Sequence, residues 1–110
     1  MNMYSDVHGM QIASPALDER EALSLAELFR ALGDASRVRI LAALLTGEHN
    51  VGELAAQAAV SESAVSHHLR GLRLMRLVRA DKRGRAVYYA LADEHVRVLL
   101  QQGLDHVRHG

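Results

Sequence analysis

Two short helical patterns joined by three residues constrain the fold of this chain more than any other feature of its sequence. Residues 51–58, VGELAAQA, are predicted to form one helix. A second helix is predicted to begin after Ser61, whose side chain is suited to cap it. Its apolar positions recur at steps of four and three, as in a buried helical stripe: Val65, Leu69 and Leu72. This spacing is that of a helix-turn-helix.

The second helix of this pair carries polar side chains between its apolar anchors. In a helix-turn-helix such positions face outward and can enter the major groove of DNA. Here they are Ser63, Ser66, His67 and Arg70. Serine and histidine can hydrogen-bond to base edges or phosphates, and arginine can hold a phosphate or bind guanine with two hydrogen bonds. We therefore expect this helix to contact double-stranded DNA.

A basic hairpin is predicted directly after this helix. Residues 77–81 and 86–91 are expected to be its strands, and Arg83-Gly84 its turn. A hairpin in this place is a wing, and the basic side chains at its tip would reach the neighbouring DNA backbone or minor groove: Lys82, Arg83 and Arg85. The alternative is a surface hairpin whose charges only keep the protein in solution.

The charges of the chain sum to zero but are unevenly placed. Between residues 61 and 92 there are seven basic residues and only two acidic ones, Glu62 and Asp81. The first sixty residues instead hold eight acidic residues and four arginines. A basic patch confined to the segment of the predicted helix and wing favours phosphate binding.

The rest of the chain indicates one mainly helical domain. Residues 1–16 lack periodicity and contain the only proline, so we expect a flexible N-terminal arm. Helices are predicted from about 18 to 32 and from about 35 until Gly47. Residues 17–110 would then form a winged helix-turn-helix, mainly α with a small β-hairpin. A domain of this size often gains stability from a second copy, so a homodimer is expected.

Several classes of protein are disfavoured by the sequence. No run of about 18 apolar residues is present and the N-terminus does not resemble a signal peptide, so we expect a cytoplasmic protein without a membrane partner. The chain has no cysteine, so a metal site would have to use His, Asp and Glu. A metal-dependent hydrolase would also need an open coordination position and a nucleophile or base, which the sequence does not indicate. We expect that the chain is not an enzyme.

The segment DEHVRVLLQQGLDHVRHG, residues 93–110, predicts a helix with metal-ligating side chains at both ends. Asp93 and His95 lie at its start, and His106 and His109 lie at its end. The three histidines share one broad face, but eleven residues at about 1.5 Å each separate His95 from His106 by roughly 16 Å. Zinc ligands lie about 2.1 Å from the metal, so one helix cannot close the site.

Two antiparallel copies of this helix can close it. In a two-fold homodimer, the start of each helix would meet the end of the other, and symmetry would give two sites. An apolar stripe beside the histidines offers a seam: Val96, Leu100, Gly103 and Val107. Within a regular helix Asp93 would point away from His95, so we expect Asp93 at the N-cap, outside helical dihedral angles.

Three segments together resemble the ArsR/SmtB family of bacterial metal-sensing repressors: ALGDASRVRILAALL, SESAVSHHLRGLRLMRLV and RGRAVYYAL. The resemblance covers about residues 18–110. It implies a winged-helix homodimer that binds operator DNA when metal-free and leaves it when metal binds. It also implies an inter-subunit site on the C-terminal helices, made by Asp93, His95, His106 and His109. The thiolate site of the family cannot be present in a chain without cysteine.

The expected effector is Zn(II), because a tetrahedral set of nitrogen and oxygen ligands suits it. Co(II) could occupy the same site and Ni(II) would prefer six ligands, so a nickel- or cobalt-sensing repressor of this family is an alternative. A metal-independent winged-helix repressor is another. Asp6 and His8 repeat the Asp-x-His pattern in the arm and could add ligands, although an isolated pair is weak evidence for this.

Overall fold

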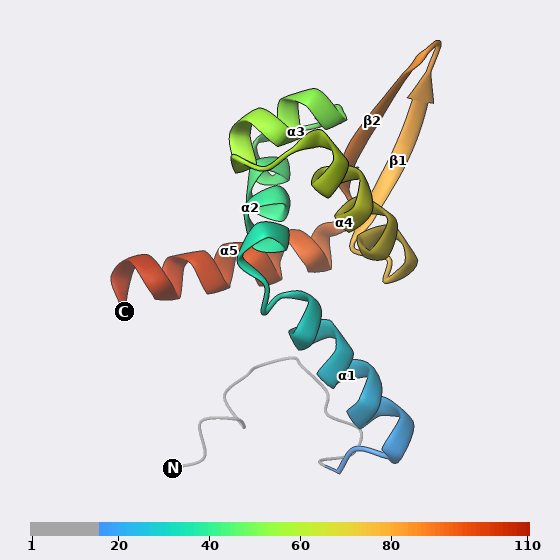
Figure 1. Cartoon of the computed structure of the whole chain (residues 1–110). Coiled ribbons are helices and arrows are strands. Elements are labelled where there is room, and N and C mark those ends of the chain that lie inside the picture. Colours follow the sequence, from blue (N-terminus) through green and yellow to red (C-terminus); the bar gives the residue numbers. More distant parts are fainter. Residues whose placement is uncertain (1–15) are drawn as a thin grey trace.

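The computed structural model describes residues 16–110, which form a mainly helical winged helix-turn-helix, as predicted (Figure 1). Its elements are α1 (Glu19–Ala31), α2 (Ala35–Ala43), the short 3-10 helix η2 (Leu44–Thr46), α3 (Val51–Ala58), α4 (Glu62–Leu74), β1 (Val78–Arg83), β2 (Ala86–Leu91) and α5 (Glu94–His109). The predicted flexible arm, apart from Ala16, lies outside the described residues. No helix within residues 16–110 is both long and apolar enough to cross a membrane.

Each α-helix of the described residues begins at a polar side chain that accepts a hydrogen bond from the backbone N–H three residues later. These caps are Asp18, Asp34, Asn50, Ser61 and Asp93. The first free N–H groups of a helix need such partners, and the cap also fixes the residue at which the helix starts. The five caps explain why the helix starts could be predicted closely from the sequence.

The core lies between α2, α3, α4 and the base of the hairpin. Ile40 and Leu41 of α2 and Leu54 of α3 have no exposed surface. The predicted stripe of α4 is buried with them: Val65, Leu69 and Leu72. Burial of this stripe fixes the rotation of α4 about its own axis, so its polar residues face solvent.

The turn between α3 and α4 consists of residues 59–61, which confirms the predicted helix-turn-helix spacing. Ala59 adopts the left-handed conformation, with φ 58° and ψ 44°. Its neighbour Val60 donates its N–H to the carbonyl of Ala55 at 3.2 Å, which closes the end of α3. A residue with a Cβ is strained in this conformation, so the tight turn is formed at some cost in stability.

The wing is a two-stranded antiparallel sheet whose pairing continues from Val78↔Leu91 to Arg83↔Ala86. The predicted turn at Arg83-Gly84 is wrong by one residue, and the predicted end of the first strand at Asp81 is wrong by two, because β1 ends at Arg83. The two-residue loop is Gly84-Arg85, because Gly84 supplies the positive φ, +61°, that the first position of a tight hairpin turn requires. Lys82 and Arg83 therefore belong to β1.

The base of the wing is joined to the loop before α3, a contact that the sequence did not indicate. His49 and Tyr89 exchange two backbone hydrogen bonds, at 3.1 and 2.8 Å. The His49 ring lies 2.9 Å from the Thr46 hydroxyl and 3.3 Å from the Glu53 carboxylate. The loop of residues 47–50 thus extends the hairpin by one short bridge.

Helices α1 and α5 contribute little to this core. Ala31 is the buried residue of α1 and Val96 that of α5. Figure 1 shows α1 running away from α2, α3 and α4, and the C-terminal part of α5 projecting beyond them. Large apolar side chains on both helices are exposed: Leu23, Leu25, Phe29, Val98 and Val107.

Replacing Ala59 by glycine should stabilise the protein by about 0.5–1 kcal/mol. Glycine removes a left-handed strain of about 1–2 kcal/mol but adds about 0.4–1 kcal/mol of chain entropy to the unfolded state. The measurement is urea unfolding of both proteins at one protein concentration. Ala58→Gly is the matched control, because Ala58 is helical and buried, and this variant should lose about 1 kcal/mol or more. Equal destabilisation of the two variants would contradict the strain at residue 59.

Candidate DNA-binding surface and metal centre

The outward face of α4 carries the side chains that the sequence predicted as DNA contacts. All four are exposed: Ser63, Ser66, His67 and Arg70. Because the buried stripe holds the opposite side of the helix, these side chains are presented by a rigid element rather than by a loop. Hydroxyl, imidazole and guanidinium groups on an exposed helix face are suited to base edges and phosphates.

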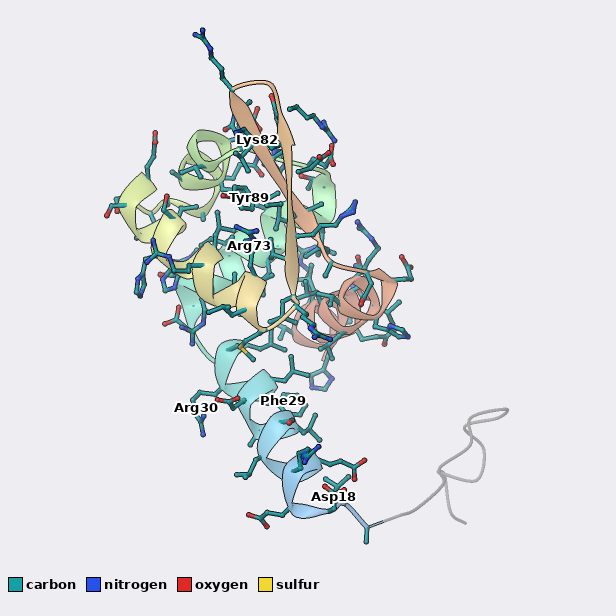
Figure 2. All side chains as sticks on the ribbon, turned by 90° about the vertical axis from the view of Figure 1, so that its right-hand side faces the viewer. Asp18, Phe29, Arg30, Arg73, Lys82 and Tyr89 are labelled. Carbon is teal, nitrogen blue, oxygen red and sulfur yellow. The ribbon has the colours of Figure 1, made fainter. Side chains whose placement is uncertain are left out.

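A hollow between α4 and the wing adds one residue to this face that the sequence analysis did not select. It is lined by Ser66, Leu69, Arg70, Arg73, Leu74 and Tyr89. Figure 2 labels Arg73 of α4 and Tyr89 of β2, which both line this hollow. Arg73 follows Arg70 by three residues, a helical spacing that places both on neighbouring positions of one face, and this spacing could have identified it.

The three basic side chains of the wing have different surroundings. Lys82 and Arg85 are exposed, and within residues 16–110 the structure gives neither of them a hydrogen-bond or ion-pair partner. Figure 2 marks Lys82 toward the tip of the hairpin. Arg83 instead donates to both oxygens of Glu48 at 2.7 and 2.8 Å, and to Asp81 at 2.9 Å. The bonds to Glu48 and then to Asp81 raise the pKa of Arg83.

The potential metal ligands lie at the two ends of α5. Asp93 has the extended dihedral angles φ −161° and ψ −179°, and its Oδ1 accepts the N–H of Val96 at 3.0 Å. The prediction of Asp93 as an N-cap is thus confirmed. Its Oδ1 lies 3.8 Å from Nδ1 of His95, whose side chain is almost fully exposed. At the other end, His106 and His109 line a shallow hollow with Gln102 and Asp105.

One protomer does not bring these two half-sites together. Within residues 16–110, no three side chains of the His, Cys, Asp and Glu types gather closely enough to hold a metal ion. The donor set is nevertheless one that Zn(II) accepts, with one carboxylate and three imidazoles. What the fold of a single chain lacks is proximity between the start and the end of α5.

An apolar groove runs along α5 beside the C-terminal half-site. Its walls come from α1, from α2 with the following 3-10 helix, and from α5. The lining residues are Phe29, Leu32, Val38, Ala42, Leu45, Leu99, Leu100, Gly103, Leu104 and Val107. Three residues of the predicted seam line this groove: Leu100, Gly103 and Val107. Val96 does not, because it is 7% exposed and packs in the core of its own protomer.

Comparisons with known proteins identify the family of this chain. The family model "Bacterial regulatory protein, arsR family" matches residues 34–80, from the cap of α2 into β1. A transcriptional repressor SmtB homolog of Synechocystis is 47% identical over 98 residues, which are 89% of this chain and 74% of the relative. The transcriptional regulator NmtR of Mycobacterium tuberculosis is 40% identical over 94% of this chain and 86% of the relative.

Solved structures agree with this assignment. The solution structure of apo-NmtR has a TM-score of 0.74 at 39% identity, covering 94% of this chain and 87% of that one. The homodimeric winged helix-turn-helix domain of Mb0332 from Mycobacterium bovis has a TM-score of 0.72 at 27% identity, covering 88% and 96%. The cadmium metal-sensor CMTR of M. tuberculosis has a TM-score of 0.62 at 49% identity, covering 70% and 80%.

These proteins are regulators of transcription, which confirms the prediction that the chain is not an enzyme. The helix-turn-helix and the wing seen in the structure agree with this family, whose model matches residues 34–80. The chain belongs to the ArsR family of bacterial regulatory proteins and has the winged helix-turn-helix fold of a transcriptional regulator.

Proposed function

We propose that this chain is a metal-responsive repressor that binds operator DNA as a metal-free homodimer and releases it when Zn(II) binds between the subunits. The observation that carries this proposal is the division of four metal-ligating side chains between the two ends of α5, with neither end sufficient alone. The sensing of cadmium by CMTR, which is 49% identical over the part compared, supports a metal effector.

A second copy of the chain is the occupant that best fits the apolar groove. Phe29 and Val107 are 57% and 79% exposed and belong to the contiguous apolar lining of the groove, and exposed apolar patches of this kind mark interaction sites. The homodimeric state of the Mb0332 domain supports a homodimer here. Pairing of α5 with its antiparallel copy would bury the groove and bring each N-terminal half-site to a C-terminal one.

Each shared site would take Asp93 and His95 from one protomer and His106 and His109 from the other. Zn(II) is favoured because one carboxylate and three imidazoles complete a tetrahedral set. Bound there, the ion would supply a bridge between the subunits and no reaction chemistry. Co(II) fits the same set, whereas Ni(II) would need further ligands. Asp6 and His8, which could add such ligands, lie outside the described residues.

The DNA contacts proposed are the exposed face of α4 in the major groove and the tip of the wing on the backbone. On α4 they are Ser63, Ser66, His67 and Arg70, with Arg73 beside them. On the wing they include Lys82 and Arg85. The spacing of the two α4 helices in the dimer would set the spacing of the operator half-sites.

Helix α5 contacts the DNA-binding unit at its N-terminal end, and we infer that these contacts couple the two sites. Only two residues, Ala92 and Asp93, separate it from the end of β2, and Val96 is buried in the core. Arg97 donates from Nη1 to the carbonyl of Leu45 at 3.2 Å. A metal ion that fixed the angle between the two α5 helices would therefore also fix the relative position of the α4 helices. A coupling of about 1.4 kcal/mol weakens DNA binding tenfold.

Phe29→Asp should convert the dimer to monomers, because a carboxylate in the apolar interface would lose its hydration. We expect the dimer dissociation constant to rise by at least about tenfold in sedimentation equilibrium. The fold should survive, since Phe29 is 57% exposed in one protomer. Leu74→Asp is the matched control: Leu74 is 81% exposed but lies on α4, outside the groove. A dimer as stable as wild type in the Phe29 variant would rule out this interface.

Complementation between two inactive variants should reveal the shared site. One variant carries Asp93→Ser and His95→Ala, where serine keeps the helix cap but removes the carboxylate. The other carries His106→Ala and His109→Ala. Neither should bind Zn(II) tightly alone, whereas an equimolar mixture should bind about one ion per four protomers, because half of the dimers hold one complete site.

Isothermal titration with Zn(II), and the absorption spectrum of Co(II), would measure this stoichiometry. Tight binding by either variant alone would place the site within one protomer. Absence of binding in the mixture, with heterodimers demonstrated by mass spectrometry, would also reject the shared site.

Metal should release the protein from DNA. A suitable probe is a labelled duplex that the metal-free protein enriches from a randomised pool. We expect Zn(II) to lower its affinity at least about tenfold in fluorescence anisotropy. The Asp93→Ser, His95→Ala variant should bind the duplex normally without metal and fail to respond. Titrations with Co(II) and Ni(II) rank the effectors, and an affinity unchanged by all three ions would indicate a metal-independent regulator.

A further inference from the structure

Arg83 differs from the other two basic residues of the wing because its guanidinium is already held by two carboxylates. Glu48 accepts with both oxygens, at 2.7 and 2.8 Å, and Asp81 accepts at 2.9 Å. The guanidinium carbon also lies 5.2 Å from the centre of the Tyr88 ring. These are the short, charge-assisted contacts that arginine normally uses to bind a carboxylate or a phosphate. Two of the three guanidinium nitrogens, Nε and Nη2, are thus already engaged within the protein.

The charge around Arg83 does not favour a phosphate either. One guanidinium faces two carboxylates, so the cluster of Glu48, Asp81 and Arg83 has a net charge of about −1 at neutral pH. Such a cluster repels a phosphate rather than attracting it. Lys82 and Arg85 have no such partners in the described part of the chain, and their charges face solvent.

The partner of Arg83 lies in the loop that leads into the helix-turn-helix. Glu48 precedes His49, which bridges to Tyr89, and Asn50, which caps α3. The wing therefore has two attachments to this loop. One is the His49–Tyr89 backbone bridge, opposite Ala80, and the other is the Arg83 side chain at the last pair before the turn. Ala80 and Arg83 lie about 10 Å apart along β1, so two attachments restrict the angle of the wing more than one.

We propose that Arg83 is a positioning residue, which holds the wing at a fixed angle to α3 and α4 by binding Glu48, and that Lys82 and Arg85 are the wing residues that bind DNA phosphates. This proposal rests on the proposed DNA-binding function. It changes the role that the sequence suggested for Arg83, from a contact with DNA to a contact within the regulator.

Salt dependence of DNA binding separates the two roles. Each phosphate contact contributes about −0.9 to the slope of log K against log salt concentration. Its loss from both protomers should therefore make this negative slope shallower by about 1.8. The matched variants are Lys82→Gln, Arg83→Gln and Arg85→Gln, which remove the same charge. They are measured without metal, in chelator, on the duplex enriched from a randomised pool.

We expect the negative slope to become shallower in the Lys82 and Arg85 variants. In Arg83→Gln the affinity should fall about two- to fivefold at every salt concentration, with the slope unchanged.

A second test removes the carboxylate that binds Arg83, in the variant Glu48→Gln. If Glu48 positions the wing through Arg83, its loss should weaken DNA binding by a similar or smaller factor, and the double variant should be no weaker than Arg83→Gln alone. All variants should unfold within a few degrees of wild type, because these side chains are at least one-third exposed and exposed ion pairs add little stability.

Two results would overturn the positioning role. One is a salt slope that becomes as shallow in Arg83→Gln as in Lys82→Gln. The other is tighter DNA binding by Glu48→Gln. Failure of the wild-type protein to enrich any duplex would overturn the proposed function instead, so the two failures are distinguishable.

Discussion

Burial of one apolar stripe on α4 is the constraint on which the rest of the structure depends. Val65, Leu69 and Leu72 pack against α2 and α3, and this leaves the helix only one orientation about its axis. The polar face of α4 is outward for that reason alone. The turn before α4 and the hairpin after it are short, so their positions follow from the same contact. The packing of the core therefore determines which side chains of α4 are presented to solvent.

Much of the fold could be predicted because its signals are local. Helix starts are set by single side chains such as Ser61 and Asp93, and apolar periodicity identifies the buried faces. The end of β1 could not be predicted as well, because pairing across the hairpin, and not composition, decides where a strand stops. Val96 illustrates the same limit, since one face of α5 serves both the core and the groove, and spacing does not separate the two.

The candidate sites were predictable to different degrees. The candidate ligand residues of α5 and their division between its two ends follow from spacing along one helix. The surroundings of Arg83 do not, because Glu48 is 35 residues away in the sequence and only the folded chain brings the two together. A basic residue in a wing has the same sequence signature whether it binds phosphate or a carboxylate of its own protein. Arg73 was missed although it follows Arg70 by three residues on the same helix.

The proposed division of metal ligands between the ends of α5 would also link metal affinity to the amount of protein. A site that exists only where two chains meet is formed by association, so metal and partner stabilise each other's binding. In the proposed function, a scarce regulator would need more metal to fill its sites than an abundant one. The threshold at which such a protein responds would then depend on its own rate of synthesis, and a change in expression could adjust it without any change in the ligands.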